Sequence, residues 1–206
     1  NRIYPAYKAN RPPAPESLKQ QFARVRELCR VLGVPEHADG EFEADDIIGH
    51  WVDEALKSGR QATVVSRDKD LTQLVNERVD WWDFAGDVRL GPMGVREKMG
   101  VDPHQVADYL ALMGDSVDNI PGVRGVGPKA AAALLDAFGN LNAVYDQIEG
   151  VAELPVRGAK SLQKKLEAGE SEARMSRELT GILASCPGSP PLPARLEPAD
   201  ISHVTQ

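Results

Sequence analysis

The chain has few cysteines and few aromatic residues, and it has no long apolar run. Among its 206 residues there are two cysteines, Cys29 and Cys186, and aromatic side chains make up 5%. Two cysteines are too few for a disulfide framework, and they lack the spacing of a zinc site, which favours a reducing compartment. Since no apolar stretch reaches the roughly 18 residues that a membrane helix needs, we expect no contact with a membrane.

Basic residues are outnumbered by acidic ones, and the two kinds are segregated along the chain. There are 24 lysines and arginines against 31 aspartates and glutamates, and the net charge of −7 argues against a generic basic nucleic-acid-binding protein. Residues 1–30 carry a net charge of +5, residues 36–118 carry −11, and residues 156–177 carry +3. This pattern fits a metal centre flanked by surfaces for a polyanion, although random surface variation would explain it about equally well.

Apolar periodicity predicts an α/β part followed by a helical part. Helices and strands alternate over the first 100 residues, which predicts a layered fold with some parallel strands, and the chain from residue 103 is all helical. The apolar strand at 62–65 is expected to be buried. The expected strands are 62–65, 79–84 and 87–90, and the expected helices are 16–32, 44–56, 71–75, 103–113, 128–138, 141–147, 159–168 and 172–183.

Three acidic clusters stand at the ends of these elements. They are Glu43-Ala44-Asp45-Asp46, Asp68-Lys69-Asp70 and Asp115-Ser116-Val117-Asp118-Asn119. Each cluster alone has an ordinary explanation, because acids are favoured at helix N-termini and aspartate is common in turns. Together they place seven carboxylates where side chains can converge on one cleft.

Converging carboxylates require cations. Two like charges 4 Å apart repel by about 4 kcal/mol at an effective dielectric constant of 20, so protonation or metal binding must relieve them. A ligand set made of oxygen alone favours Mg²⁺ or Mn²⁺ over Zn²⁺, and shared carboxylates suit two ions roughly 3.5–4 Å apart that promote phosphodiester hydrolysis. The histidines His37, His50, His104 and His203 show no metal-binding spacing, and no serine hydrolase or P-loop motif is present.

A glycine-rich turn separates two of the predicted helices. Residues 121–129 read PGVRGVGPK, with a proline where the next helix begins. Backbone amides at such a helix N-terminus can bind a phosphate, and Arg124 and Lys129 add positive charge. A tight helix connection would explain an isolated Gly-x-Gly, but this longer pattern is more specific and favours a turn that holds a DNA backbone without reading bases.

These motifs resemble those of the 5′-nuclease (flap endonuclease) family. The acidic cluster at 43–46, the residues SRDKD at 66–70 and LMGDSVDNIPGV at 112–123 are similar to the 5′→3′ exonuclease domain of bacterial DNA polymerase I and its stand-alone homologues. Residues 4–11, YPAYKANR, resemble the family segment beside the active-site arch. The similarity covers most of residues 2–184.

The resemblance implies a PIN/resolvase-like central sheet flanked by helices, followed by an all-helical helix–three-turn–helix DNA-binding region. We therefore expect an α/β catalytic core over 1–118, a helical region over 103–184 and a proline-rich tail over 187–206. The implied function is structure-selective 5′→3′ exonuclease and 5′-flap endonuclease cleavage of DNA in replication and repair. The implied setting is a bacterial cytoplasm, at the nucleoid, with a polymerase linked in cis or in trans.

The resemblance also implies roles for individual residues. Two divalent ions, Mg²⁺ or Mn²⁺, would be held by seven acids: Glu43, Asp45, Asp46 and Asp68 nearer one ion, and Asp70, Asp115 and Asp118 nearer the other. The catalytic residues Lys8 and Arg11 would steer the scissile phosphate, and Tyr7 would stack on a base. Duplex DNA would be held, in relatives often through a K⁺ ion, by the turn residues Gly122, Arg124, Gly125, Gly127 and Lys129.

The chain departs from the family pattern at its start. No aspartate precedes Asp39, whereas the family has an early strand with an aspartate ligand and a later strand with another, and these strands would complete the sheet. Since the first residue is not methionine, we expect the chain to begin inside a longer gene product. Two other interpretations remain: a DNA-junction-binding module without catalysis, and a metal-dependent phosphatase of small molecules.

Overall fold

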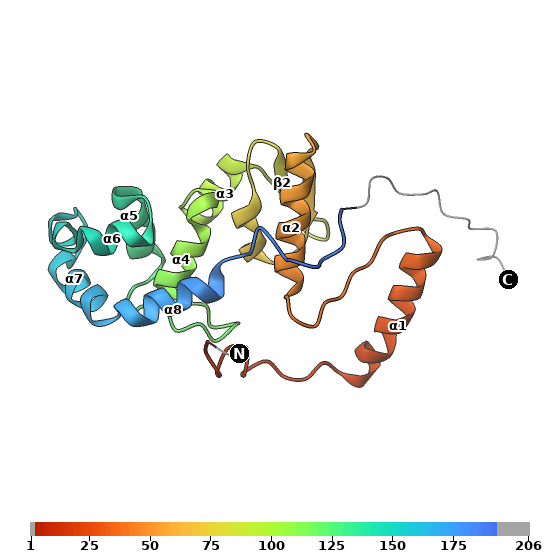
Figure 1. The fold of residues 1–206 in the computed structure, drawn as a ribbon. Helices are drawn as coiled ribbons and strands as arrows, with labels where there is room; N and C mark the ends of the chain where they lie inside the picture. Colours follow the sequence, from red (N-terminus) through yellow and green to blue (C-terminus); the bar gives the residue numbers. More distant parts are fainter. Residues whose placement is uncertain (1–2, 193–206) are drawn as a thin grey trace.

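The computed structural model describes residues 3–192, which form a small mixed sheet in one half and a group of helices in the other (Figure 1). The strands are β1 (Ala62–Val65), β2 (Val79–Asp83) and β3 (Val88–Leu90), in the order β1-β2-β3. Strands β1 and β2 are parallel, with Val64 opposite Trp81, and β3 is antiparallel to β2, with Leu90 opposite Trp81. The predicted α/β character of this part of the chain is confirmed.

Three helical segments accompany the sheet. They are α2 (Ala44–Lys57), the 3₁₀ helix η1 (Lys69–Leu74) and α3 (Pro92–Met99). Helices α2 and η1 lie where the sequence predicts helices, and α2 buries Ile47, Val52 and Ala55. Helix α3 is missing from the prediction because it is short and buries only Val95, so it has almost no apolar period.

The second half of the chain is all helical, as predicted. Its elements are η2 (Pro103–Gln105), α4 (Val106–Met113), α5 (Pro128–Phe138), α6 (Leu141–Asp146), η3 (Ile148–Glu153), α7 (Ala159–Ala168) and α8 (Glu170–Thr180). The largest difference from the predicted bounds is at α8, which ends at Thr180 rather than at residue 183. Among residues 3–192, no helix is both long and apolar enough to cross a bilayer.

Helices α4 and α8 form the central pair of this half, and they are joined by polar contacts as well as by packing. Asp108 of α4 is buried, and its carboxylate accepts hydrogen bonds from Arg177 Nε at 2.5 Å and from Leu141 N–H at 2.9 Å. Thr180 Oγ1 donates to the Ala107 carbonyl at 2.8 Å. Because each of these buried polar groups has a partner, the pair α4–α8 has one preferred register.

Helix α1 (Glu16–Val31) forms where predicted but none of its residues is buried. Its apolar face, which includes Leu18, Phe22, Val25 and Leu28, is between 44% and 57% exposed. Figure 1 shows α1 standing apart from the rest of the protein, with extended chain leading to it and away from it. The apolar period therefore predicts the helix correctly, but it does not show where the apolar face is covered.

Strand β1 is less buried than the sequence predicts. Only Val64 of its four residues is buried, and Val65 is 59% exposed. The reason is that side chains alternate between the two faces of a strand: Ala62 and Val64 are on the covered face, whereas Thr63 and Val65 are on the exposed face. The predicted proline-rich tail is described only as far as Leu192, and residues 193–206 lie outside the described part.

The segment that follows α8 runs back along α2 and joins the two halves (Figure 1). Leu183 N–H donates to Asp46 Oδ1 at 3.1 Å, and Trp51 Nε1 donates to the Pro190 carbonyl at 2.9 Å. The segment lies so close to α2 that a Cβ at Gly49 would be 2.7 Å from the Leu183 oxygen. Glycine at this position of α2 is therefore required by the packing.

A direct backbone contact closes the loop between α4 and α5. Gly114 and Gly122 both have positive φ, and a Cβ at Gly122 would overlap the Gly114 backbone and lie 2.6 Å from the carbonyl carbon of Met113. The N–H of Gly122 donates to Ser176 Oγ of α8 at 3.2 Å. The loop that contains Asp115 and Asp118 is thus closed at its base by two residues without side chains.

We predict that Gly122→Ala lowers the free energy of unfolding by about 2–4 kcal/mol, because a Cβ there combines a steric overlap with a strained φ. Gly139→Ala is the matched control, since Gly139 also has positive φ but no atom within 4 Å of the added Cβ. Its cost should be about 1 kcal/mol. Urea unfolding of both variants measures the difference, and equal losses would show that the contact with Gly114 is unimportant.

Candidate active site

Carboxylates from three separate segments line one cavity between the two halves. The cavity has a volume of about 770 Å³ and is bordered by the N-terminus of α2, the end of α8 and the loop after α4. Its lining includes Tyr7 and five of the predicted metal ligands, Glu43, Asp45, Asp46, Asp70 and Asp118. Asp68 and Asp115 are outside the lining, yet their charges raise the pKa of Asp70. The three acidic clusters are therefore neighbours in space.

The first cluster is at the N-terminus of α2. Glu43 is the N-cap residue, and its N–H donates to Asp46 Oδ2 at 3.2 Å. The other oxygen of Asp46 accepts the hydrogen bond from Leu183 N–H, so each oxygen of this carboxylate accepts a hydrogen bond from a backbone N–H. Burial and the charge of Asp68 raise the pKa of Asp45 above its usual range.

The second cluster follows β1. Asp68 is the N-cap residue of η1, and its Oδ1 accepts a hydrogen bond from Asp70 N–H at 3.0 Å. Within the described residues, Asp70 Oδ1 is buried without a hydrogen-bond partner. Burial, followed by the charges of Asp68 and Asp115, raises the pKa of Asp70 to about 7. Near neutral pH this carboxyl group is therefore ready to take up a proton or a cation.

The third cluster is held rigidly in the loop after α4. Asp115 pairs through its backbone with Ile120, and its Oδ1 accepts a hydrogen bond from Val117 N–H at 2.7 Å. Its Oδ2 is 3.1 Å from Lys69 Nζ. Burial opposes the charge of Lys69, but the hydrogen bond to Asp115 prevails, so the pKa of Lys69 is raised. Sequence reasoning assigned Lys69 no role, and its place between Asp68 and Asp70 was the only signal.

Basic residues of the N-terminal segment pair with two of the acids, Glu43 and Asp118. Lys8 Nζ is 2.5 Å from Glu43 Oε2 and 3.8 Å from Asp118 Oδ2, and Arg11 forms an ion pair with Asp118. Burial opposes the charge of Lys8, but hydrogen bonds to Glu43 and Tyr7 raise its pKa overall. Tyr7 OH donates to Glu43 at 3.3 Å. The predicted phosphate-steering residues thus lie at the acids, as a catalytic role requires.

The glycine-rich turn leads from this loop to α5. Helix α5 begins at Pro128 with Gly127 as its N-cap residue, so its first amides are at the turn, as predicted. Arg124, Gly125, Gly127 and Lys129 are exposed. Gly122 is buried, and its N–H is already used by Ser176, so its contact with DNA remains a prediction.

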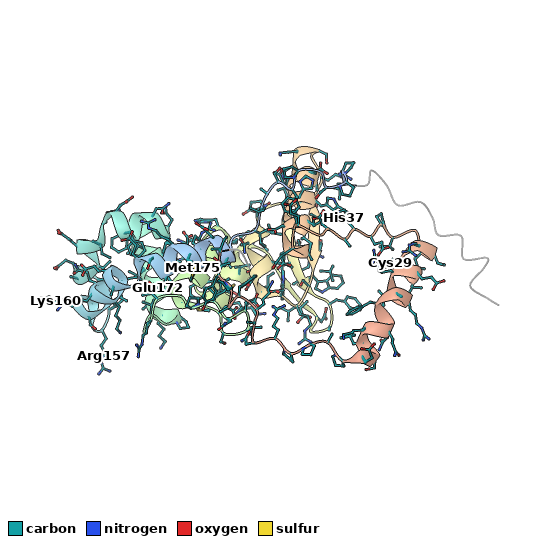
Figure 2. All side chains as sticks on the ribbon, turned by 60° about the horizontal axis from the view of Figure 1, so that its bottom comes forward. Cys29, His37, Arg157, Lys160, Glu172 and Met175 are labelled. Carbon is teal, nitrogen blue, oxygen red and sulfur yellow. The ribbon has the colours of Figure 1, made fainter. Side chains whose placement is uncertain are left out.

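A second cavity, of about 720 Å³, borders the same turn. Arg124, Lys164 and Lys165 contribute to its lining, and Lys165 Nζ donates to the Gly125 carbonyl at 3.2 Å. In Figure 2, Arg157 and Lys160 extend outward at the end of the protein opposite to α1. The predicted basic block at 156–177 therefore places positive charge beside the turn.

The chain matches two family models that together span almost its whole length. Residues 1–100 match the 5′-3′ exonuclease N-terminal resolvase-like domain, and residues 101–202 match the 5′-3′ exonuclease C-terminal SAM fold. The chain belongs to the 5′-3′ exonuclease family. This confirms the predicted family and the order of a resolvase-like part and a helical part.

Relatives and solved structures of the 5′-3′ exonuclease family agree with this assignment. DNA polymerase I of Pseudomonas aeruginosa is 41% identical over 88% of this chain and 20% of its own length. A 5′-3′ exonuclease of Buchnera aphidicola is 34% identical over 91% of this chain and 65% of its own length. The bacteriophage T5 flap endonuclease, solved as a pseudo-enzyme-product complex with DNA and metal ions, is 27% identical with a TM-score of 0.72, covering 87% of this chain and 68% of that one.

The chain spans about a fifth of the polymerase I sequence and about two thirds of the Buchnera exonuclease. The similarity to polymerase I, measured along this chain, covers both halves described above. The resolvase-like part contains the first two acidic clusters, and the helical part contains the third cluster and the glycine-rich turn. The candidate site of this family member is therefore built from both parts.

The chemistry of the candidate ligands suits a divalent metal ion that prefers oxygen ligands. All seven candidate ligands are carboxylates, and the buried Asp70 Oδ1, which has no partner within the described residues, is an atom that a cation would satisfy. As the side chains stand in residues 3–192, no three acids are close enough together to hold one ion. Glu43, Asp115 and Asp118 are instead paired with Lys8, Lys69 and Arg11. Metal binding would therefore replace these basic partners.

We predict that Asp70→Asn stabilises the metal-free protein above pH 7 and has no effect near pH 4. The folded protein holds a proton on Asp70 up to about pH 7, whereas an unfolded aspartate loses it near pH 4. Below pH 4 the carboxyl group is protonated in both states and behaves like the neutral amide, and between pH 4 and 7 the native protein loses stability because only the unfolded state gives up this proton. In EDTA at pH 8 the variant should gain about 1–2 kcal/mol in urea unfolding.

Asp146→Asn, at an exposed position of α6, is the control and should change stability by less than about 0.5 kcal/mol at both pH values. A stability difference for Asp70→Asn that does not depend on pH would contradict the raised pKa.

Proposed function

We propose that this chain forms the nuclease centre of a metal-dependent 5′→3′ exonuclease and 5′-flap endonuclease that hydrolyses DNA phosphodiesters in replication and repair. The observation that carries the proposal is the cavity lined by carboxylates of three segments, with a phosphate-binding type of turn at the next helix. The family supports the reaction class. The T5 flap endonuclease, solved with DNA and metal ions, supports the substrate and the need for metal.

The seven acids would hold two ions, Mg²⁺ or Mn²⁺, with Glu43, Asp45, Asp46 and Asp68 nearer one and Asp70, Asp115 and Asp118 nearer the other. When bound, such ions supply a water activated for attack and stabilise the negative charge on the leaving oxygen. The raised pKa values of Asp45 and Asp70 support this role, because crowded carboxylates gain most from a nearby cation. Asp46 would also keep α2 in place through its bonds to Glu43 and Leu183.

Lys8 and Arg11 would bind the scissile phosphate. In the metal-free protein they are paired with Glu43 and Asp118. Once these acids are neutralised by metal, the ammonium and guanidinium groups become available to a phosphate at the same cavity, where they balance the charge that develops during attack. Tyr7, which lines the cavity, would stack on a base at the cleaved end.

The glycine-rich turn would hold the duplex through its phosphates. The exposed Arg124, Gly125, Gly127 and Lys129 offer amides and positive charge without groups that read bases. A K⁺ ion at the turn belongs to the proposal as well, and it would compete with Lys165 for the carbonyl of Gly125. The bacterial relatives support a cytoplasmic location and a polymerase in cis or in trans, and association with the nucleoid would follow from binding to DNA.

The experiment that tests this function uses 5′-flap DNA labelled at its end. We predict that Mg²⁺ supports cleavage, that EDTA abolishes it, and that Asp118→Asn lowers the cleavage rate at least about 1,000-fold while DNA binding persists. Asp136→Asn is the control, since that exposed residue of α5 pairs with Arg96 away from the cavity.

Two results would overturn the proposal. Wild-type cleavage that continues in EDTA would refute the metal-dependent reaction. Flap binding with no cleavage by the wild-type chain in Mg²⁺ or Mn²⁺ would favour the non-catalytic DNA-junction module instead.

We predict that Lys129→Ala weakens binding to duplex DNA uniformly across sequences. Removing one phosphate contact should lower the slope of log K against log salt by about 1. Fluorescence anisotropy at several salt concentrations measures this slope. Lys57→Ala at the end of α2 serves as the control, and an identical slope for Lys129→Ala and wild type would count against the role of the turn.

A further inference from the structure

The N-terminal segment is bound to the loop after α4 by hydrogen bonds that are separate from its ion pairs. Asn119 Nδ2 donates to the Ala6 carbonyl at 2.6 Å, and Asn10 Nδ2 donates to the Ser116 carbonyl at 2.8 Å. In addition, Lys8 N–H donates to the Asp118 carbonyl at 2.9 Å. Two asparagine amides and one backbone amide therefore hold the segment on the acidic loop.

The backbone at this contact is unusual on both sides. Lys8 has φ of 57° and Asn119 has φ of 58°, so each of the two contacting segments contains a non-glycine residue in the left-handed region. Asparagine tolerates this conformation better than most side chains, because its short amide can form local hydrogen bonds. Aspartate would tolerate the backbone equally well, but its carboxylate cannot donate to the carbonyl of Ala6.

The side-chain amide of Asn119 donates to the carbonyl of Ala6, which is one residue before Tyr7 and two before Lys8. The carbonyl of Ala6 also accepts from Ala9 N–H at 3.1 Å, so the bond from Asn119 holds a turn that is already formed. That turn directs the Lys8 ammonium to Glu43 and the Tyr7 hydroxyl to the same carboxylate. The position of both side chains over the cavity thus depends on where Ala6 is held.

We propose that Asn119 is a positioning residue, whose side-chain amide fixes the segment that carries Tyr7, Lys8 and Arg11 against the acidic cavity. The inference rests on the proposed function for its effect on cleavage, whereas the tether itself can be tested without DNA. Asn119 lies in the same short loop as Asp115 and Asp118. One loop therefore supplies two of the acids and also fixes the basic residues that face them.

The test uses Asn119→Gly and Asn119→Asp. The glycine variant removes the amide and permits the positive φ, so the fold should persist. The aspartate variant keeps the shape and removes the donor. Asn142→Asp, at an exposed position of α6, is its matched control, because a carboxylate at that position could still accept the hydrogen bond from Arg174. Limited trypsin digestion reports the tether, because release of the peptide ending at Lys8 requires the segment to leave the loop.

We expect the cut after Lys8 to become about tenfold faster in both Asn119 variants and unchanged in Asn142→Asp, since loss of one hydrogen bond raises the population of the open segment by up to about that factor. The cut after Arg24 in α1 is the internal reference. In flap cleavage, kcat should fall about tenfold while KM for the DNA stays within about twofold, because the glycine-rich turn that holds the duplex is untouched.

Three results decide the inference. A wild-type rate of cutting after Lys8 in both Asn119 variants would overturn the tether. Faster cutting with unchanged kcat would overturn the positioning role. If the wild-type chain cleaves no flap DNA, the proposed function fails, and the trypsin comparison still confirms or overturns the tether.

Discussion

The contact between Gly114 and Gly122 determines how the candidate site is built. No side chain fits between these two backbones, and both residues need a positive φ. The loop between them carries Asp115 and Asp118, and the chain beyond them forms the glycine-rich turn. Because Gly122 is also hydrogen-bonded to Ser176 of α8, the loop and the turn are anchored to the same helix pair, α4 and α8. The acids and the surface proposed for DNA therefore cannot move independently.

Electrostatic repulsion is the second constraint on the site. Several carboxylates share one region, in which Asp115 and Asp118 are buried and Glu43 and Asp68 are exposed, and the structure relieves their charge in two ways. Lys8, Arg11 and Lys69 pair with Glu43, Asp118 and Asp115, and Asp70, which has no such pair, has a pKa raised to about 7. The basic residues act as cations within the metal-free protein. If the proposed function holds, the same feature would prepare the site for divalent metal, because an ion that replaced the basic residues would also free them for a phosphate.

The sequence predicts most of the helices and strands because their apolar periods are strong, and it predicts the acidic clusters because they stand at element ends. It fails where a property depends on a partner distant in the chain. Helix α1 has a clear apolar face, but periodicity contains no information on what covers that face. Strand β1 reads as buried because most of its side chains are apolar, yet only one of its two faces is covered in the fold.

The same limit applies to the site. Glu43, Asp45, Asp70 and their neighbours could be chosen from the sequence, since chemistry restricts which residues bind metal. The double use of Asp46 could not be foreseen, because its partner Leu183 is 137 positions away. Lys69 and Asn119 were hidden for a similar reason, since an ion pair and an amide bond to a distant carbonyl leave no periodic pattern.

The arrangement also explains how a site without base-reading groups could select a substrate. If the proposed function holds, the acidic cavity and the glycine-rich turn both bind phosphates, so neither distinguishes one sequence from another. Their separation is fixed by the Gly114–Gly122 contact and by the packed helix pair α4–α8. A DNA molecule can fill both sites only if a duplex lies at the turn while a phosphodiester near a 5′ end reaches the acids. Selectivity would then follow from the shape of the DNA and the rigidity of the protein between two unselective contacts.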